Sequence, residues 1–231
     1  MKITTFNRCL SENFPSYDFE GVWFDSFGRP ATNATWFVYA PSGSGKTSFM
    51  VQLAYYMSRF CKVGYISAEE GQSLSFKQAL TNNKPETAAE PITLVSEPDG
   101  YDGLREILDT KYKVKFWIID SIDYIGLTKT QVKDLISEYC TNAKRGQKYL
   151  KGFAMVGFAD GNKPQTSAGN YMKYAAGIKV FVKDFIAEEI NSRYGGNRQP
   201  FVIKEKLAAE RRGGEMIWNY NNNWNAGGSP A

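Results

Sequence analysis

Histidine is absent from all 231 residues of this chain. Its absence excludes a Ser-His or Cys-His nucleophile pair and disfavours a zinc enzyme, so any general base must be a carboxylate. Cysteine is scarce as well, since Cys9, Cys61 and Cys140 are odd in number and far apart. This usage predicts reduced thiols in a cytoplasmic protein and no zinc site.

Long hydrophobic runs and a strong charge imbalance are also lacking. No run approaches the ~18 apolar residues of a membrane span, and residues 1–8 lack a signal-peptide core. We therefore expect no membrane partner. The net charge of +4 permits contact with nucleic acid without demanding it. A 42% hydrophobic share and a 23% charged share are typical of a globular protein with one sizeable core.

The most informative segment spans residues 40–47, which read Ala-Pro-Ser-Gly-Ser-Gly-Lys-Thr. It follows an apolar run at 34–39 and precedes a helical apolar pattern, so we predict a strand, a glycine-rich loop and a helix. The N–H groups of such a loop and the positive end of its helix form a cradle for a polyphosphate. Lys46 would reach the β- and γ-phosphates, and the Thr47 hydroxyl would bind Mg²⁺.

One position departs from the usual phosphate-loop (Walker A) pattern, because Ala40 replaces its first glycine. A methyl group at the end of a strand is a small change. A flexible Gly/Ser linker that ends in Lys-Thr is the alternative interpretation. The predicted nucleotide-binding residues are Ser42, Gly43, Ser44, Gly45, Lys46, Thr47 and Ser48.

Apolar strands alternate with helical patterns along the chain. Strands are predicted at 34–39, 62–67, 92–95, 115–120, 152–158 and 178–182, and helices at 49–60, 73–81, 101–110, 129–145 and 170–176. This alternation predicts an α/β fold with a mainly parallel twisted sheet covered on both faces. A C-terminal antiparallel hairpin with its turn at 194–197 is expected at the sheet edge, with a helix at 187–193 as the alternative.

The same pattern divides the chain into three parts. Residues 34–206 form the predicted core, and residues 1–33 are expected to be a lead-in that packs on it. Residues 207–231 form a C-terminal extension that is rich in turn residues, and we expect it to be partly disordered.

Three carboxylates are candidates for chemistry. Asp120 ends an apolar strand, where it would face the ligand crevice of an open α/β sheet and hold Mg²⁺ through a water opposite Thr47. A turn-forming aspartate is the alternative. Glu69 and Glu70 end the second strand, where one of them could polarise an attacking water. Surface glutamates that favour a helix N-terminus are the alternative there.

These segments, taken in order, resemble RecA-like P-loop ATPases, which include recombinases, RadA-type proteins and DnaB-type helicases. The resemblance covers residues 34–205 and rests on the phosphate loop, Tyr-Ile-Ser-Ala-Glu at 65–69 and Trp-Ile-Ile-Asp-Ser-Ile at 117–122. It implies that Glu69, not Glu70, is the catalytic glutamate and that Asp120 is the metal-binding acid.

The resemblance extends to Asn-Ser-Arg-Tyr-Gly-Gly at 191–196. This segment is similar to a Lys-Asn-Arg-Phe-Gly type motif, although Asn191 replaces the lysine. Arg193 matches the arginine that points toward a neighbour's ATP and stabilises the transferring phosphoryl group. It therefore implies a homo-oligomer, as a ring or filament. An ordinary turn arginine is the alternative, and Arg211 and Arg212 are other candidates.

The family likeness also implies a nucleic-acid partner. In relatives, loops after the Asp strand and after the next strand hold DNA, and the second of these corresponds to residues 160–174. Lys163 and Lys173 could contact phosphates of single- or double-stranded DNA, and Tyr171 or Tyr174 could stack on a base. Packing of the two tyrosines within the protein is the alternative.

The motifs predict an enzyme that binds ATP and Mg²⁺, and the resemblance implies that it couples hydrolysis to recombination, annealing or unwinding of DNA. Its compact core suggests a phage or mobile-element protein. An ATP-dependent switch or scaffold without nucleic acid is the main alternative, and a small-molecule kinase is a third.

Overall fold

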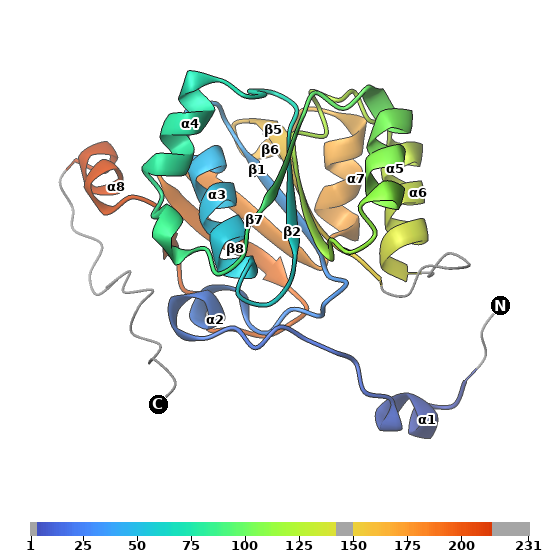
Figure 1. The fold of residues 1–231 in the computed structure, drawn as a ribbon. Helices are drawn as coiled ribbons and strands as arrows, with labels where there is room; N and C mark the ends of the chain where they lie inside the picture. Colours follow the sequence, from blue (N-terminus) through green and yellow to red (C-terminus); the bar gives the residue numbers. More distant parts are fainter. Residues whose placement is uncertain (1–3, 142–149, 214–231) are drawn as a thin grey trace.

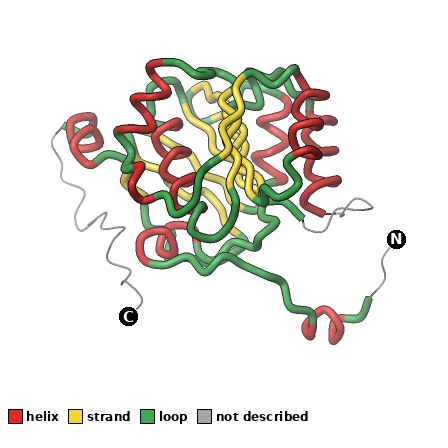
Figure 2. Tube along the Cα trace, viewed as in Figure 1, coloured by secondary structure: helices red, strands yellow, loops and turns green. Residues whose placement is uncertain are grey.

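A twisted sheet lies between two layers of helices in the computed structural model, which describes residues 4–141 and 150–213 (Figures 1 and 2). The order of its strands is β3-β2-β4-β5-β1-β7-β8-β9, with β6 paired to β5. The strands are β1 (Thr35–Ala40), β2 (Val63–Ser67), β3 (Thr93–Ser96), β4 (Phe116–Asp120), β5 (Gly152–Asp160), β6 (Lys163–Pro164), β7 (Ile178–Lys183), β8 (Ile186–Ser192) and β9 (Phe201–Val202).

Strand directions confirm the predicted α/β class. The strands from β3 to β7 pair in parallel along the sheet, whereas β7, β8 and β9 pair antiparallel at its C-terminal edge. Parallel strands need crossover connections, and helices provide them here. The sheet is therefore mostly parallel with an antiparallel edge.

Helices cover both faces of this sheet (Figure 1). They are α1 (Phe6–Ser11), α2 (Gly21–Phe27), α3 (Lys46–Met57), α4 (Leu74–Thr81), α5 (Gly100–Thr110), α6 (Lys129–Leu135), α7 (Ser167–Ala175) and α8 (Glu205–Arg211), with a 3₁₀ turn at Pro85–Thr87 and a π-helical turn at Ile136–Thr141. Helices α2, α3 and α4 contribute to one apolar cluster, and α5, α6 and α7 contribute to the other. None of the helices in the described part of the chain has the length and hydropathy to cross a bilayer.

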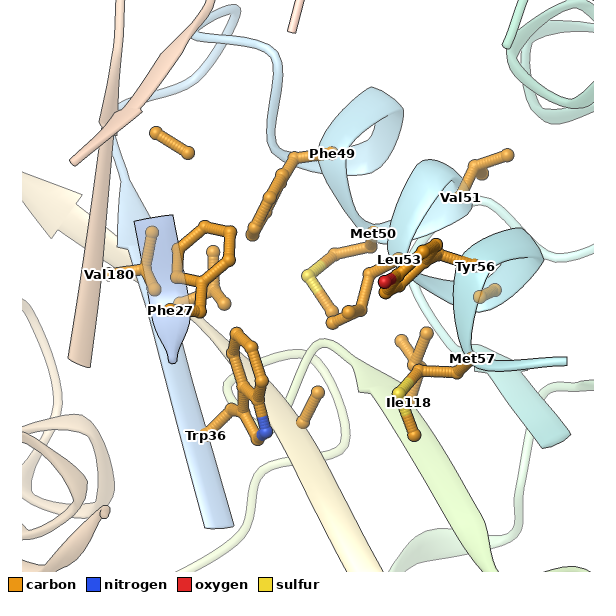
Figure 3. Close-up of a cluster of buried hydrophobic side chains, with 14 of the residues drawn as sticks. Phe27, Trp36, Phe49, Met50, Val51, Leu53, Tyr56, Met57, Ile118 and Val180 are labelled. Carbon is orange, nitrogen blue, oxygen red and sulfur yellow. The ribbon is translucent and has the colours of Figure 1, made fainter. Parts of the chain in front are cut away.

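Strand β1 shows why the sheet needs continuous apolar runs. Its side chains alternate between the two clusters, with Trp36 and Val38 on one face and Phe37 and Tyr39 on the other. On the first face, the Trp36 ring lies 5.2 Å from the Phe27 ring, which in turn lies 5.7 Å from the Phe49 ring in the cluster of Figure 3. Because both faces are buried, every position of this strand favours an apolar residue.

The N-terminal lead-in differs along its length. Tyr17, Phe19 and Trp23 are buried, and the Trp23 ring stacks on Tyr56 of α3 at 4.7 Å between centroids. Helix α1 instead has no buried residue and lies apart from the sheet at the end of an extended segment (Figure 1). Residues from about 17 to 33 therefore form part of the folded body.

The C-terminal strands correct one predicted alternative. Residues 187–193 do not form a helix, because β8 pairs with β7 around a tight turn at Asp184 and Phe185. The predicted turn at 194–197 lies in the longer connection from β8 to β9. That connection is held on α2, where Asn197 donates from its N–H and its Nδ2 to Asp25, each at 2.7 Å.

Two other predicted boundaries also shift. The helix expected at 129–145 is α-helical only to Leu135 and π-helical to Thr141, and its last residues lie outside the described part. Helix α8 extends the ordered chain to Arg211, past the predicted core boundary at 206. The expected disorder at the C-terminus concerns mainly residues 214–231, which also lie outside the described part.

Candidate nucleotide-binding site

Apart from Arg193, the predicted nucleotide-binding, metal-binding and catalytic residues lie where the parallel strands end. Strands β1, β2, β4 and β5 run in the same direction, and their register pairs Ala40 with Phe158 and Ser67 with Asp120. The carboxyl ends of these strands therefore face the same crevice, which is where open α/β sheets bind ligands. The phosphate loop leaves β1 at this edge and enters α3.

The loop has the backbone shape that its glycines suggest. Gly43 and Gly45 adopt φ values of 72° and 99°, in the left-handed region. A Cβ on Gly45 would also lie 2.8 Å from a ring atom of Phe185, whose N–H donates to the Ser44 carbonyl. Helix α3 begins at Lys46 without a side-chain cap, so its first N–H groups remain open to an anion.

Lys46 brings a buried ammonium to this edge. The residue is only 9% exposed. Its Nζ donates a hydrogen bond to the Ala40 carbonyl at 3.3 Å and lies 5.0 Å from the centre of the Phe158 ring. Burial lowers the pKa of this ammonium, while the charges of Asp120 and Glu69 raise it. An ammonium has three donors, so Lys46 can satisfy more acceptors than the described residues provide.

Asp120 is the buried acid of the site. Its Oδ2 accepts a hydrogen bond of 2.8 Å from the hydroxyl of Tyr65 on β2. Burial raises the pKa of the Asp120 carboxyl to about 6, although the Tyr65 hydrogen bond lowers it. The peptide bond that follows, to Ser121, is cis.

The two glutamates after β2 differ in their contacts. Glu70 accepts from Thr47 Oγ1 at 3.2 Å and from Ser75 Oγ at 2.7 Å. Glu69 is exposed, and partial burial raises the pKa of its carboxyl while the Lys46 charge lowers it. Both carboxylates therefore border the crevice, but Glu70 is the one tied to Thr47.

These residues fit a magnesium–nucleotide. A hydroxyl and a carboxylate are oxygen donors of the kind that Mg²⁺ prefers, and it keeps water and phosphate oxygens as its remaining ligands. Within the described residues no cluster of three or more His, Cys, Asp or Glu could enclose a metal by itself. The donor set would therefore suit a metal that arrives with a phosphate, and Thr47 and Asp120 are the residues that would hold it.

Arg193 lies away from this crevice. It follows β8, where Ser192 pairs with Ile178, and Ile178 in turn pairs with Trp36 at the start of β1. The phosphate loop leaves the carboxyl end of β1, so Arg193 lies at the opposite end of the parallel strands. About 13 Å of strand separates the two ends, at ~3.3 Å per residue.

Residues 160–174 form a short hairpin and a helix. Tyr174 is 80% exposed, whereas Tyr171 is half-buried with the Lys129 ammonium 6.0 Å from its ring centre. Lys173 donates to the Asn162 carbonyl at 3.2 Å. Of the four residues predicted to contact DNA, Tyr174 and Lys163 are therefore the two that are exposed.

The sequence interpretation missed Asp123, three residues after Asp120. Its Oδ2 accepts from the Phe158 N–H at 2.6 Å, and its Oδ1 accepts from the Thr166 hydroxyl at 2.5 Å. Thr166 is the N-cap of α7. The sequence contains no signal for these contacts, because the two partners of Asp123 lie 35 and 43 residues further along the chain.

Comparisons with known proteins do not assign this geometry: no family model matches the chain, and no curated protein matches it significantly. The function must therefore be inferred from the site and from the sequence pattern.

Proposed function

We propose that this chain is a RecA-like P-loop ATPase that binds ATP with Mg²⁺ and hydrolyses the γ-phosphate. The observation that carries the proposal is the Lys46 ammonium, buried at the start of α3 with donors to spare and with Asp120 close enough to affect its pKa. A buried cation beside an uncapped helix N-terminus favours a polyanion.

Each residue then has a distinct task. Lys46 binds the β- and γ-phosphates, and the loop N–H groups bind the remaining phosphate oxygens. Thr47 supplies a hydroxyl ligand to Mg²⁺, which when bound neutralises charge on the phosphates. Asp120 fixes a water of that metal, and Glu69 orients the attacking water and takes its proton.

The partners belong to the same proposal. Arg193 lies at the edge opposite its own phosphate loop, so any action on ATP requires a neighbouring copy, which supports a ring or filament. Exposed Tyr174 and Lys163 support contact with DNA through residues 160–174, by stacking and by phosphate binding. Recombination, annealing or unwinding is the kind of process such an ATPase would drive.

Two measurements on the purified full chain test this proposal. Calorimetry with ATP and Mg²⁺ should show binding that Lys46→Ala abolishes, and unchanged binding in that variant would refute it. Phosphate release should then rise when single-stranded DNA is added. A rate that does not respond to DNA would support the switch or scaffold alternative.

A further inference from the structure

Glu70 joins the phosphate-loop helix to the start of α4. Its Oε1 accepts from Thr47 Oγ1 at 3.2 Å, and its Oε2 accepts from Ser75 Oγ at 2.7 Å. The Ser75 oxygen also lies 2.8 Å from the Ser73 oxygen. Because Ser75 has one proton and gives it to Glu70, Ser73 must donate to Ser75. Both oxygens of the Glu70 carboxylate therefore accept a hydrogen bond, one from Thr47 and one from the Ser73–Ser75 pair.

Ser73 is itself fixed by the backbone. Its hydroxyl oxygen accepts from the Phe76 N–H at 3.1 Å and caps α4, and the Phe76 side chain is buried. Each donor in such a chain strengthens the next hydrogen bond. The Glu70 carboxylate is thus held at a set position beside Thr47 before any ligand binds.

We propose that Glu70 is a positioning residue for the metal that Thr47 binds, a role that rests on the proposed function. A threonine hydroxyl has one proton and two lone pairs. Glu70 accepts the hydrogen bond that this proton makes, so the lone pairs of Thr47 point away from Glu70 and are available to Mg²⁺. Donation to a carboxylate also makes the hydroxyl oxygen a better ligand.

This role separates the two adjacent glutamates. Glu70 is held by two side-chain hydrogen bonds, whereas the described residues give the Glu69 carboxylate none. Glu69 thus remains free to contact the attacking water, and Glu70 serves the metal. The sequence resemblance favours Glu69 as the catalytic residue, and the hydrogen bonds add a separate role for Glu70.

The expected effect is on the requirement for metal. Removing a partner that orients a metal ligand typically costs about 10- to 100-fold in metal affinity or activity. Binding of nucleotide without metal depends on Lys46 and the loop N–H groups, whereas the side-chain hydrogen bonds of Glu70 within the described residues are with Thr47 and Ser75. Glu70→Ala should therefore raise the magnesium concentration needed for nucleotide binding without weakening binding in the absence of metal.

The test is a magnesium titration with a fluorescent, non-hydrolysable ATP analogue on the full chain, so that turnover plays no part. Glu70→Ala should need about 10- to 100-fold more Mg²⁺ for half-maximal binding, while its affinity in EDTA stays equal to wild type or rises. Glu70→Gln, which keeps an acceptor oxygen and nearly the same shape, should show a smaller shift in the same direction.

Two further variants provide the controls. Ser75→Ala keeps the carboxylate but removes one of its donors, so its shift should lie between wild type and Glu70→Ala. Glu69→Gln removes a neighbouring charge without touching the Thr47 contact, and its magnesium requirement should change far less. A thermal melt of each variant without ligand verifies that it is folded.

The outcomes separate this inference from the proposed function. If wild type and Glu70 variants share one magnesium requirement, Glu70 has no positioning role, although the ATPase proposal stands. Equal shifts in Glu69→Gln and Glu70→Ala would also overturn it, because charge alone would then explain the effect. If wild type binds no nucleotide with or without Mg²⁺, the proposed function itself is wrong.

Discussion

The hydroxyl of Tyr65 donates a hydrogen bond of 2.8 Å to Oδ2 of Asp120, between neighbouring strands β2 and β4. Both side chains are buried. The bond satisfies one oxygen of a carboxylate that has little access to water and that interacts electrostatically with Lys46. Tyr65 therefore fixes the orientation of the proposed metal-binding acid.

Tyr65→Phe should destabilise the protein at pH 8. A hydrogen bond to a charged group contributes about 1.5–3 kcal/mol, and its loss leaves a buried carboxylate without this donor. Tyr55→Phe is the matched control, because Tyr55 donates to the neutral Leu80 carbonyl at 3.0 Å. Urea unfolding measures both. Equal losses in the two variants would show that the charge on Asp120 adds nothing.

Asp120→Asn should make the ligand-free protein more stable at pH 8. Burial raises the pKa of the Asp120 carboxyl from 3.8 to about 6, so its contribution to stability is full below pH 3.8 and is lost as the pH rises through 6. The charged form therefore opposes folding at pH 8, by about 1–3 kcal/mol at 1.36 kcal/mol per pKa unit.

The pH series is the check on that prediction. Urea unfolding of wild type and Asp120→Asn at pH 4.5, 6 and 8 should give a difference that shrinks toward acid. The same variant should lose the magnesium dependence of nucleotide binding. A variant that is less stable than wild type at pH 8 would contradict the direction of the pKa shift.

Lys46→Ala should remove the stabilisation that nucleotide gives. A ligand that binds only the folded state stabilises it by about 2.7 kcal/mol at 100 times its dissociation constant. Wild type should therefore unfold at higher urea with ATP and Mg²⁺ than without, and Lys46→Ala should not. Lys77→Ala, on the exposed side of α4, should behave as wild type.

Glu69→Gln should keep nucleotide binding and lose turnover. A positioned general base contributes about 10²- to 10⁴-fold, and an amide cannot take the proton of the attacking water. The rate of phosphate release measures turnover, and calorimetry on the same sample measures the affinity for nucleotide. Unchanged turnover would mean that Glu69 is not the base.

Arg193→Ala should be inactive alone but recover activity when mixed with Lys46→Ala. In mixed oligomers, an intact phosphate loop from one variant can face an intact arginine from the other. Loss of an arginine that acts on a neighbour's phosphate costs about 10³-fold or more. Mixtures that stay inactive at every ratio, or full activity of Arg193→Ala alone, would remove the proposed role in trans.

Sequence pattern predicted much of the fold because it reports on burial. The apolar run at 34–39 and the glycines after it correspond to β1, the loop and α3, since both signals are local. The tight turn at Asp184 and Phe185 could not be predicted. Both residues have positive φ although neither is a glycine. Gly195 and Gly196 suggested a turn at 194–197, and no comparable signal marks 184–185 in the sequence.

The details of the site depend on contacts that sequence does not record. Whether Glu69 or Glu70 lies beside Thr47 follows from the backbone after β2 and from the position of Ser75 on α4. The Tyr65 contact with Asp120 follows from the register of β2 against β4. Residue types and order suggested acids near a phosphate, but only the fold assigns each acid its partner.

The carboxylate of Asp123 connects three segments of the chain. Asp123 belongs to the loop after β4, and it holds both the end of β5 and the cap of α7. If the loop beside Asp120 shifts, it must either carry Thr166 and the first turn of α7 with it or break two short hydrogen bonds together. Small shifts of the loop after β4 are thus coupled to the first turn of α7, the helix that also carries Tyr174.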